Sequence, residues 1–222
     1  MNQFNQIDTL LTTDKVYREL KNAILKRTLI PGQKLDIFQL AEQFNVSRTP
    51  VKEAFNRLQM EGLLVIRPRK GTYVAEIDLN KVAEVFDARL LFETWAAQVG
   101  IPQASEEEIL ELRALSQQMD DCYKAETFDF FSFNELDNQF HQSIVRMGRN
   151  QSILDLYKSL NAHRITERAY YEFAYEKAQS THDQHYAIVE AYIKRDVAEA
   201  VEQITKHIVS GKQMLAVFHN NR

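Results

Sequence analysis

The sequence predicts a mainly α-helical protein in two parts, a small N-terminal domain that ends in a β-hairpin and a longer all-helical domain. Up to about Gly62, apolar residues recur at helical spacing in three short segments, and β-branched and aromatic segments follow. From Asp78 onward the helical pattern continues with few glycines or prolines. A chain of 222 residues can form two domains, and we expect them to span residues 10–76 and 78–218.

Three short helices are expected in the N-terminal domain. The first covers residues 14–27 and the second residues 37–44, and Pro31-Gly32 forces a turn between them. The third begins at Thr49-Pro50, because threonine can cap a helix and proline suits its first position. Glu61-Gly62 ends this helix, since glycine accepts the left-handed conformation that is common at helix C-termini.

A change of period after the third helix predicts two β-strands. The segments LLVIRP and GTYVAEI flank a basic tip at residues 67–71, which is typical of a hairpin. Three short helices followed by a basic hairpin make a winged helix-turn-helix. In the second domain, long helices joined by short loops predict an all-α antiparallel helical bundle. Its helices are expected near residues 79–99, 105–124, 127–147, 151–176, 180–194 and 197–217.

Charge is divided unequally between the two domains. Residues 1–76 hold 12 Lys and Arg against 8 Asp and Glu, whereas the remainder holds 15 against 23. A basic N-terminal domain, called the head below, joined to an acidic second domain fits a phosphate-binding domain followed by one that does not bind nucleic acid. The alternative is that the charge asymmetry arose by chance. Cys122 is the only cysteine, so no internal disulfide can form, which favours a reducing, cytoplasmic compartment. No secretory signal and no membrane-spanning segment is expected.

The third helix has the pattern of a DNA-reading helix. Such a helix buries one side and presents polar, mostly basic groups from its N-terminal part to the major groove. Val51, Phe55 and Leu58 supply the apolar side, and the basic residues near the start of the helix could donate to guanine or to phosphate. The basic hairpin tip would reach the backbone or the minor groove. The expected DNA-binding residues are Arg48, Thr49, Lys52, Arg67, Arg69, Lys70 and Gly71.

Residues 46–54, VSRTPVKEA, resemble the signature of the GntR superfamily of bacterial transcription regulators. The resemblance implies two protomers that bind a palindromic operator through their winged heads. Lys52 departs from the family, which usually carries arginine there. Lysine keeps the charge for phosphate binding but loses the bidentate fork for base recognition. The alternative is a winged helix used for protein contacts. The resemblance extends to Pro31-Gly32, Leu40-Ala41, Glu61-Gly62-Leu63, Arg67 and Lys70-Gly71.

Residues of metal-ligand type lie on apolar helix faces in the second domain. Asp137 and His141 share a face with several phenylalanines, because residues i and i+4 are one helical turn apart. His185 and His207 each lie on an apolar stripe of another helix. A carboxylate and three imidazoles suit a divalent ion such as Zn²⁺ or Ni²⁺, and the alternative is that each is a hydrogen-bonded core residue. His182, one turn before His185, is expected to be an outer partner or to face solvent.

The second domain resembles the FadR-like (FCD) effector domain of the same superfamily. Many of its members bind a metal through an aspartate and three histidines, and the resemblance implies this role for Asp137, His141, His185 and His207. It also implies that Arg89 and Glu93 line an effector pocket, where Arg89 could hold a carboxylate ligand bidentately. The alternative is that these two residues only pair with each other. His163 and Arg164 are further effector-binding candidates.

Together these patterns predict a ligand-responsive, homodimeric DNA-binding regulator and not an enzyme. The expected effector is a small organic acid coordinated to the metal and clamped by Arg89. A metal-dependent hydrolase with an accessory DNA-binding head is one alternative. A regulator whose metal is purely structural, or is itself the signal, is another.

Overall fold

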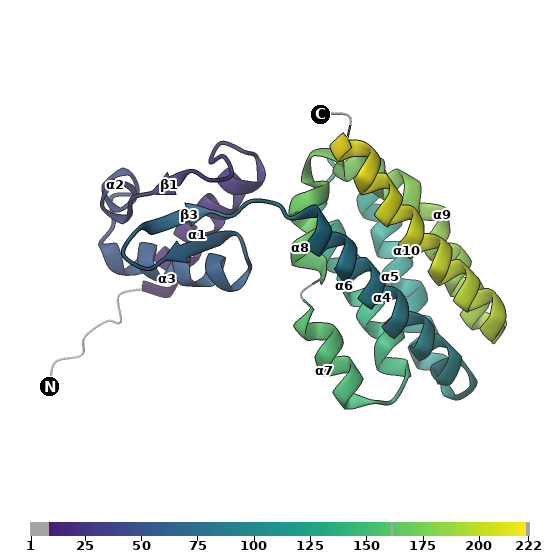
Figure 1. The fold of residues 1–222 in the computed structure, drawn as a ribbon. Helices are drawn as coiled ribbons and strands as arrows, with labels where there is room; N and C mark the ends of the chain where they lie inside the picture. The colour runs from purple at the N-terminus through teal and green to yellow at the C-terminus, as the bar shows by residue number, and fades with distance from the viewer. Residues whose placement is uncertain (1–8, 161, 221–222) are drawn as a thin grey trace, which may run out of the picture. The chain divides into compact units, whose positions relative to one another are not determined.

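The structure, a computed structural model, describes residues 9–160 and 162–220 (Figure 1). The chain divides into two compact units, Met1–Ile77 and Asp78–Arg222. Helices dominate both, and in the described part of the chain strands occur in the first unit only. The prediction of a mainly α fold, with a winged helix-turn-helix before an all-helical domain, is confirmed.

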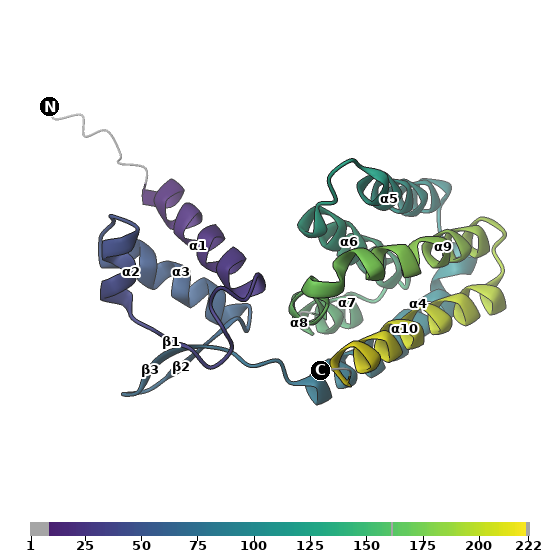
Figure 2. The same cartoon turned by 90° about the horizontal axis from the view of Figure 1, so that it is seen from above.

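The first unit combines three helices with a small antiparallel sheet of order β1-β3-β2. Strands β2 and β3 form the predicted hairpin, with Arg67 opposite Gly71 at its tip. Strand β1 was not predicted, because two residues are too few to show an alternating pattern. In Figure 2 the sheet lies along one side of the helices. The elements are α1 (Thr9–Leu25), β1 (Lys34–Leu35), α2 (Ile37–Gln43), α3 (Arg48–Met60), β2 (Leu64–Arg67) and β3 (Gly71–Val74).

Helices α1 and α3 pack against each other and form the core of this unit. Val16 and Leu20 on α1 are buried, as are Val51 and Leu58 on α3. Burial of these side chains stabilises the pair by roughly 1.5–3 kcal/mol for each residue relative to its exposed state. Because this face of α3 is fixed in the core, the opposite face of the helix is left on the surface.

The second unit is a bundle in which five long helices contact one another in a closed ring. Around the ring α4 contacts α10, α10 contacts α9, α9 contacts α5, α5 contacts α6, and α6 contacts α4. Side chains that point inward from four or five helices therefore meet in one core. The helices are α4 (Leu79–Gly100), α5 (Glu106–Lys124), α6 (Phe130–Met147), α7 (Gln151–Ser159), α8 (Ala162–Tyr170), α9 (Ala174–Ile193) and α10 (Val197–Asn220), with short 3-10 turns at Ile101–Gln103 and Tyr171–Phe173.

The prediction of one helix over residues 151–176 is wrong. This stretch holds α7, α8 and a 3-10 turn, and α9 begins at Ala174 instead of near residue 180. Tyr157 on α7 and Tyr170 on α8 are both buried, while α7 packs mainly on α6 and α8 on α4. The chain changes direction to make these separate contacts without a glycine or proline, so the periodicity did not reveal the break.

Among the described helices, none combines the length and apolar character that crossing a bilayer requires.

Candidate metal centre and nucleic-acid interface

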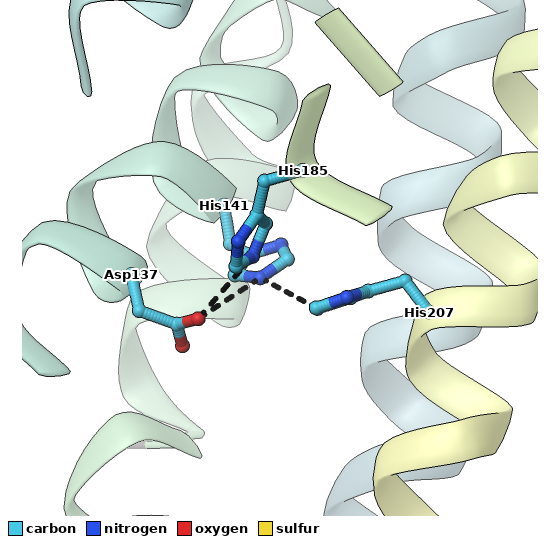
Figure 3. Close-up of side chains that lie close together, drawn as sticks. All are labelled: Asp137, His141, His185 and His207. Atoms are coloured by element: carbon cyan, nitrogen blue, oxygen red, sulfur yellow. Dashed lines mark hydrogen bonds and ion pairs between the residues drawn. The ribbon is translucent and has the colours of Figure 1, made fainter. Parts of the chain in front are cut away.

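The four predicted metal ligands come together in the bundle core. Asp137 and His141 project from α6, His185 from α9 and His207 from α10, and all four are buried. One candidate ligand atom from each residue lies within 4.8 Å of the others. Figure 3 shows the carboxylate and the imidazoles turned toward one another. The ring of packed helices therefore brings residues up to 70 positions apart in the sequence into one cluster.

The distances between these side chains place several acceptor atoms around one point. Asp137 Oδ1 lies 3.4 Å from His185 Nε2 and 3.9 Å from His141 Nε2. His141 Nε2 lies 3.1 Å from His207 Nε2. Asp137 Oδ1 and His185 Nε2 are buried, and apart from their loose 3.4 Å contact with each other neither has a well-aligned hydrogen bond among the described residues. Buried polar atoms without hydrogen-bond partners destabilise a folded protein. This arrangement therefore indicates that a further bound group would supply the missing interactions.

Outer hydrogen bonds fix which nitrogen of each imidazole faces the centre. His141 Nδ1 lies 2.7 Å from Glu93 Oε2, and His207 Nδ1 lies 3.1 Å from Gln184 Oε1. Both oxygens are acceptors, so a neutral imidazole at either position donates through Nδ1 and keeps a lone pair on Nε2. Two lone pairs that face each other across 3.1 Å repel unless a cation lies between them. The donor set fits a divalent metal ion bound by nitrogen and oxygen ligands.

The protonation states of the ligands agree with this chemistry. Burial lowers the pKa of His207 well below its usual value, with a further contribution from His185 and His141. Burial also lowers the pKa of His185, although Asp137 acts in the opposite direction. For Asp137 burial alone would raise the pKa, but Lys177 and the two nearest histidines hold it well below the usual value. His185 and His207 are therefore neutral imidazoles and Asp137 is an ionised carboxylate, which are the forms that bind metals.

Arg89 and Glu93 belong to a buried network that reaches the metal cluster. Arg89 Nε donates to Glu93 Oε1 at 2.8 Å, and the Tyr157 hydroxyl donates to the same oxygen at 2.7 Å. Burial alone would raise the pKa of Glu93, but Arg89 and His141 lower it to about 2. Arg89 Nη2 is buried and has no hydrogen-bond partner among the described residues. The pairing considered as an alternative is present, and it does not satisfy all the guanidinium nitrogens of Arg89.

The remaining candidates in this unit are His163, Arg164 and His182. His163, on α8, is partly exposed, and its carbonyl oxygen accepts from Asn134 Nδ2 at 3.5 Å. The side chain of Arg164 lies outside the described residues. His182 Nδ1 lies 3.0 Å from Asp120 Oδ1, away from the four clustered ligands. The structure thus groups Arg89 and Glu93 with the metal ligands and does not place His163 or His182 among them.

Sequence reasoning missed three residues that complete the centre. Gln184 and Tyr157 hydrogen-bond to His207 and Glu93, and Lys177 Nζ lies 3.2 Å from Asp137 Oδ2. Lys177 is only 6% exposed, which is unusual for a lysine. The available signal was its position on α9, two turns before His185, on the same side of the helix.

In the first unit the predicted DNA-binding residues lie on the surface. Arg48, Thr49 and Lys52 are exposed at the start of α3, and Arg67, Arg69 and Lys70 are exposed on the hairpin. Gly71 has a φ of +122°, a conformation that L-residues with side chains rarely adopt. A surface groove of about 370 Å³ lies between α2, α3 and the sheet, and Lys34 and Lys52 line it.

Aromatic rings hold two of these cations in place. The Arg48 guanidinium lies 4.9 Å from the centre of the Phe38 ring, and the Arg67 guanidinium lies 4.9 Å from the centre of the Tyr73 ring. Phe38 remains 62% exposed, so the pair stays on the surface. Cation–π contacts of this kind stabilise an exposed pair by roughly 0.5–1 kcal/mol and restrict the motion of the arginine.

Comparison with known proteins identifies both units. Residues 12–74 match the family described as bacterial regulatory proteins, gntR family, and residues 84–210 match the FCD domain. The chain belongs to the GntR family. It is a DNA-binding transcription regulator of this family that carries a ligand-responsive FCD effector domain. The resemblance inferred from the sequence is confirmed.

Relatives in the family are named as regulators. The HTH-type transcriptional repressor RspR of Escherichia coli K12 is 32% identical over 197 residues, which cover 87% of this chain and 84% of the relative. The Nta operon transcriptional regulator of Aminobacter aminovorans is 27% identical over 178 residues, 80% of this chain and 82% of the relative. A solved structure of a GntR regulator from Rhodococcus sp. RHA1 has a TM-score of 0.68 at 18% identity, covers 92% of this chain and 97% of that one, and supports the fold.

Replacement of Glu93 by glutamine is expected to destabilise the second unit more than Tyr157→Phe does. E93Q leaves Arg89 buried without a counter-charge, a loss of roughly 3–5 kcal/mol. Y157F removes one hydrogen bond to a charged group, a loss of roughly 1.5–3 kcal/mol. Calorimetry of the full chain, following the transition of the second unit, measures both. Equal losses would mean that Glu93 does not act as the counter-charge of Arg89.

Proposed function

We propose that this GntR-family regulator acts as a homodimer that binds a palindromic operator through its winged heads and senses a small organic acid at a metal centre in the bundle. Each head contacts the major groove with the start of α3 and the backbone or minor groove with the hairpin tip. The proposed DNA-binding residues are Arg48, Thr49, Lys52, Arg67, Arg69, Lys70 and Gly71.

Surface charge and rigidity in the head support DNA binding. The basic residues at the start of α3 and on the hairpin are exposed, while the apolar side of α3 is buried. Phe38 and Tyr73 restrain Arg48 and Arg67, so these guanidinium groups lose little freedom when they meet DNA. Exposed cations with few competing partners are the groups that release counterions from DNA.

The observation that carries the metal proposal is the convergence of four buried ligand-type atoms, two of which lack a well-aligned hydrogen bond. Asp137, His141, His185 and His207 would hold Zn²⁺ or Ni²⁺, and their buried Oδ1 and Nε2 atoms already point to one centre. When bound, the ion would supply a Lewis-acid contact for an oxygen of an acidic ligand. Glu93 and Gln184 orient His141 and His207 for this role.

The effector proposal rests on the network around Arg89. Its unsatisfied Nη2 can donate to a carboxylate, and Glu93 links the same guanidinium to His141. We place His163 and Arg164 among the effector contacts on the family resemblance alone. For the ligand to act as a signal, it must bind two arrangements of the heads with different affinity.

Two alternatives make different predictions. A hydrolase would show metal-dependent turnover on a panel of simple esters and phosphoesters, and the names of the relatives support regulation instead. A structural metal would change thermal stability on chelation without changing operator affinity in the folded protein. A metal that is itself the signal would change operator affinity without any acid.

Lys52→Gln is expected to weaken binding to a duplex that the full-length protein selects from a random library. The loss of one phosphate contact should reduce the slope of log affinity against log salt by about 1. Fluorescence anisotropy at several salt concentrations measures the slope. Lys158→Gln removes an equal charge from an exposed position on α7 and is the control. The same slope in K52Q as in the unmodified chain would contradict the phosphate contact.

His207→Gln is expected to lower the affinity for Zn²⁺ or Ni²⁺ by more than the roughly 10–100-fold loss typical of an outer-shell partner. The physical reason is the loss of a nitrogen that faces the centre. Chelator competition and the metal content after dialysis give the readout. His182→Gln is the matched control, because His182 pairs with Asp120 outside the cluster. If the two variants retain metal equally, these four residues are not the ligands.

At least one small carboxylate, in a panel of mono-, di- and hydroxy acids, is expected to change the operator affinity of the metal-loaded protein. Arg89→Lys should weaken that response, since lysine keeps the charge but cannot make two parallel hydrogen bonds. Arg113→Lys, at an exposed position on α5, is the control. Anisotropy titrations with and without each acid measure the effect. No response across a broad panel would count heavily against an acid effector.

A further inference from the structure

Lys177 is a buried cation that pairs with Asp137, one of the four candidate metal ligands. Its Nζ lies 3.2 Å from Asp137 Oδ2, and the residue is 6% exposed. Asp137 Oδ1, the other oxygen, is 3.4 Å from His185 Nε2. One carboxylate oxygen is therefore occupied by an ammonium group, and the other faces the metal position without a hydrogen-bond partner among the described residues.

Aromatic rings keep this ammonium group in place. Lys177 Nζ lies 5.2 Å from the centre of the Tyr170 ring and 5.7 Å from the centre of the Phe133 ring. Both rings are fully buried. These contacts stabilise the cation through the negative faces of the rings and do not involve the histidines. Lys177 can therefore stay in position whether or not the metal position is filled.

From this arrangement we propose that Lys177 is a built-in counter-charge for Asp137, which lets the metal-free domain stay folded and makes metal binding reversible. The proposal rests on the proposed metal site. A buried carboxylate without a counter-charge is strongly destabilising, and in the metal-free protein Lys177 supplies that charge. The free Oδ1 can then accept a divalent ion without displacing the ammonium group.

The same charge has the opposite effect on the metal-bound state. A divalent cation bound at Asp137 Oδ1 is repelled by the nearby ammonium, and in a buried site this repulsion is weakly screened. Lys177 therefore stabilises the metal-free state and lowers the affinity for metal. A residue that only positioned Asp137 for ligation would instead raise the affinity.

The test compares Lys177→Met and Lys177→Gln with the charge-preserving Lys177→Arg in the full chain. Zn²⁺ affinity is measured by chelator competition at pH 8, and the thermal midpoint of the second unit is measured with and without Zn²⁺. K177M and K177Q should bind Zn²⁺ tighter by a factor of about ten or more. Both should melt lower than the unmodified chain when metal-free, while K177R stays close to it in both measurements.

Weaker Zn²⁺ binding by K177M and K177Q would overturn the proposal and make Lys177 a residue that supports ligation. Neutral variants that are unfolded without metal but fold with Zn²⁺ would support it, whereas variants that stay unfolded with saturating Zn²⁺ would overturn it. Asp137→Asn in the same assay separates failure of the Lys177 proposal from failure of the proposed metal site on which it rests. If the unmodified chain binds no Zn²⁺, or D137N binds it equally well, the proposed metal site itself fails.

Discussion

Charge buried in the bundle core is the constraint on which the second unit depends. Asp137 and Glu93 are almost fully buried, and so are Arg89 and Lys177, the cations that compensate them. Removing such groups from water costs several kcal/mol per ion, and only close pairing repays it. The Lys177–Asp137 pair joins α9 to α6, and the Glu93–His141 contact joins α4 to α6. These contacts fix the relative positions of helices that apolar packing alone would allow to slide.

The same network connects Arg89 to the proposed metal centre. Arg89 bonds to Glu93, Glu93 bonds to His141, and His141 faces His207. Under the proposed function, a ligand that moved the Arg89 guanidinium would change the hydrogen bonding of His141, a proposed metal ligand two contacts away. Because His207 lies on α10 and Glu93 on α4, such a change reaches the two helices that pack most extensively together. This connection is the physical basis on which an acid could alter the bundle.

The head meets a different physical requirement. Its cations lie in water, where each contributes little to stability and remains available for phosphates. Arg57 and Lys21 are exceptions. Arg57 bonds to Asp14 at 2.5 Å and lies over the Tyr17 ring, so it joins α3 to α1, and Lys21 pairs with Glu61 at 3.5 Å. The basic groups at the start of α3 and on the hairpin do not serve the core in this way. The chain thus keeps the charges proposed for DNA recognition on the surface and buries the charges that pair within the bundle core.

The sequence by itself determined the fold class and the family, because helical periodicity, turn residues and the VSRTPVKEA motif are local signals. The four candidate metal ligands were implied together by the family resemblance and not by these local signals. The sequence placed Asp137 and His141 on one face, but it could not show that His185 and His207 meet them. The tertiary structure decided that, together with the break between α7 and α8 and the roles of Lys177, Tyr157 and Gln184. Those contacts join residues 23 to 64 positions apart. The packing of the helix ring brings such residues together. Local sequence patterns do not predict which inward-facing side chains will contact one another.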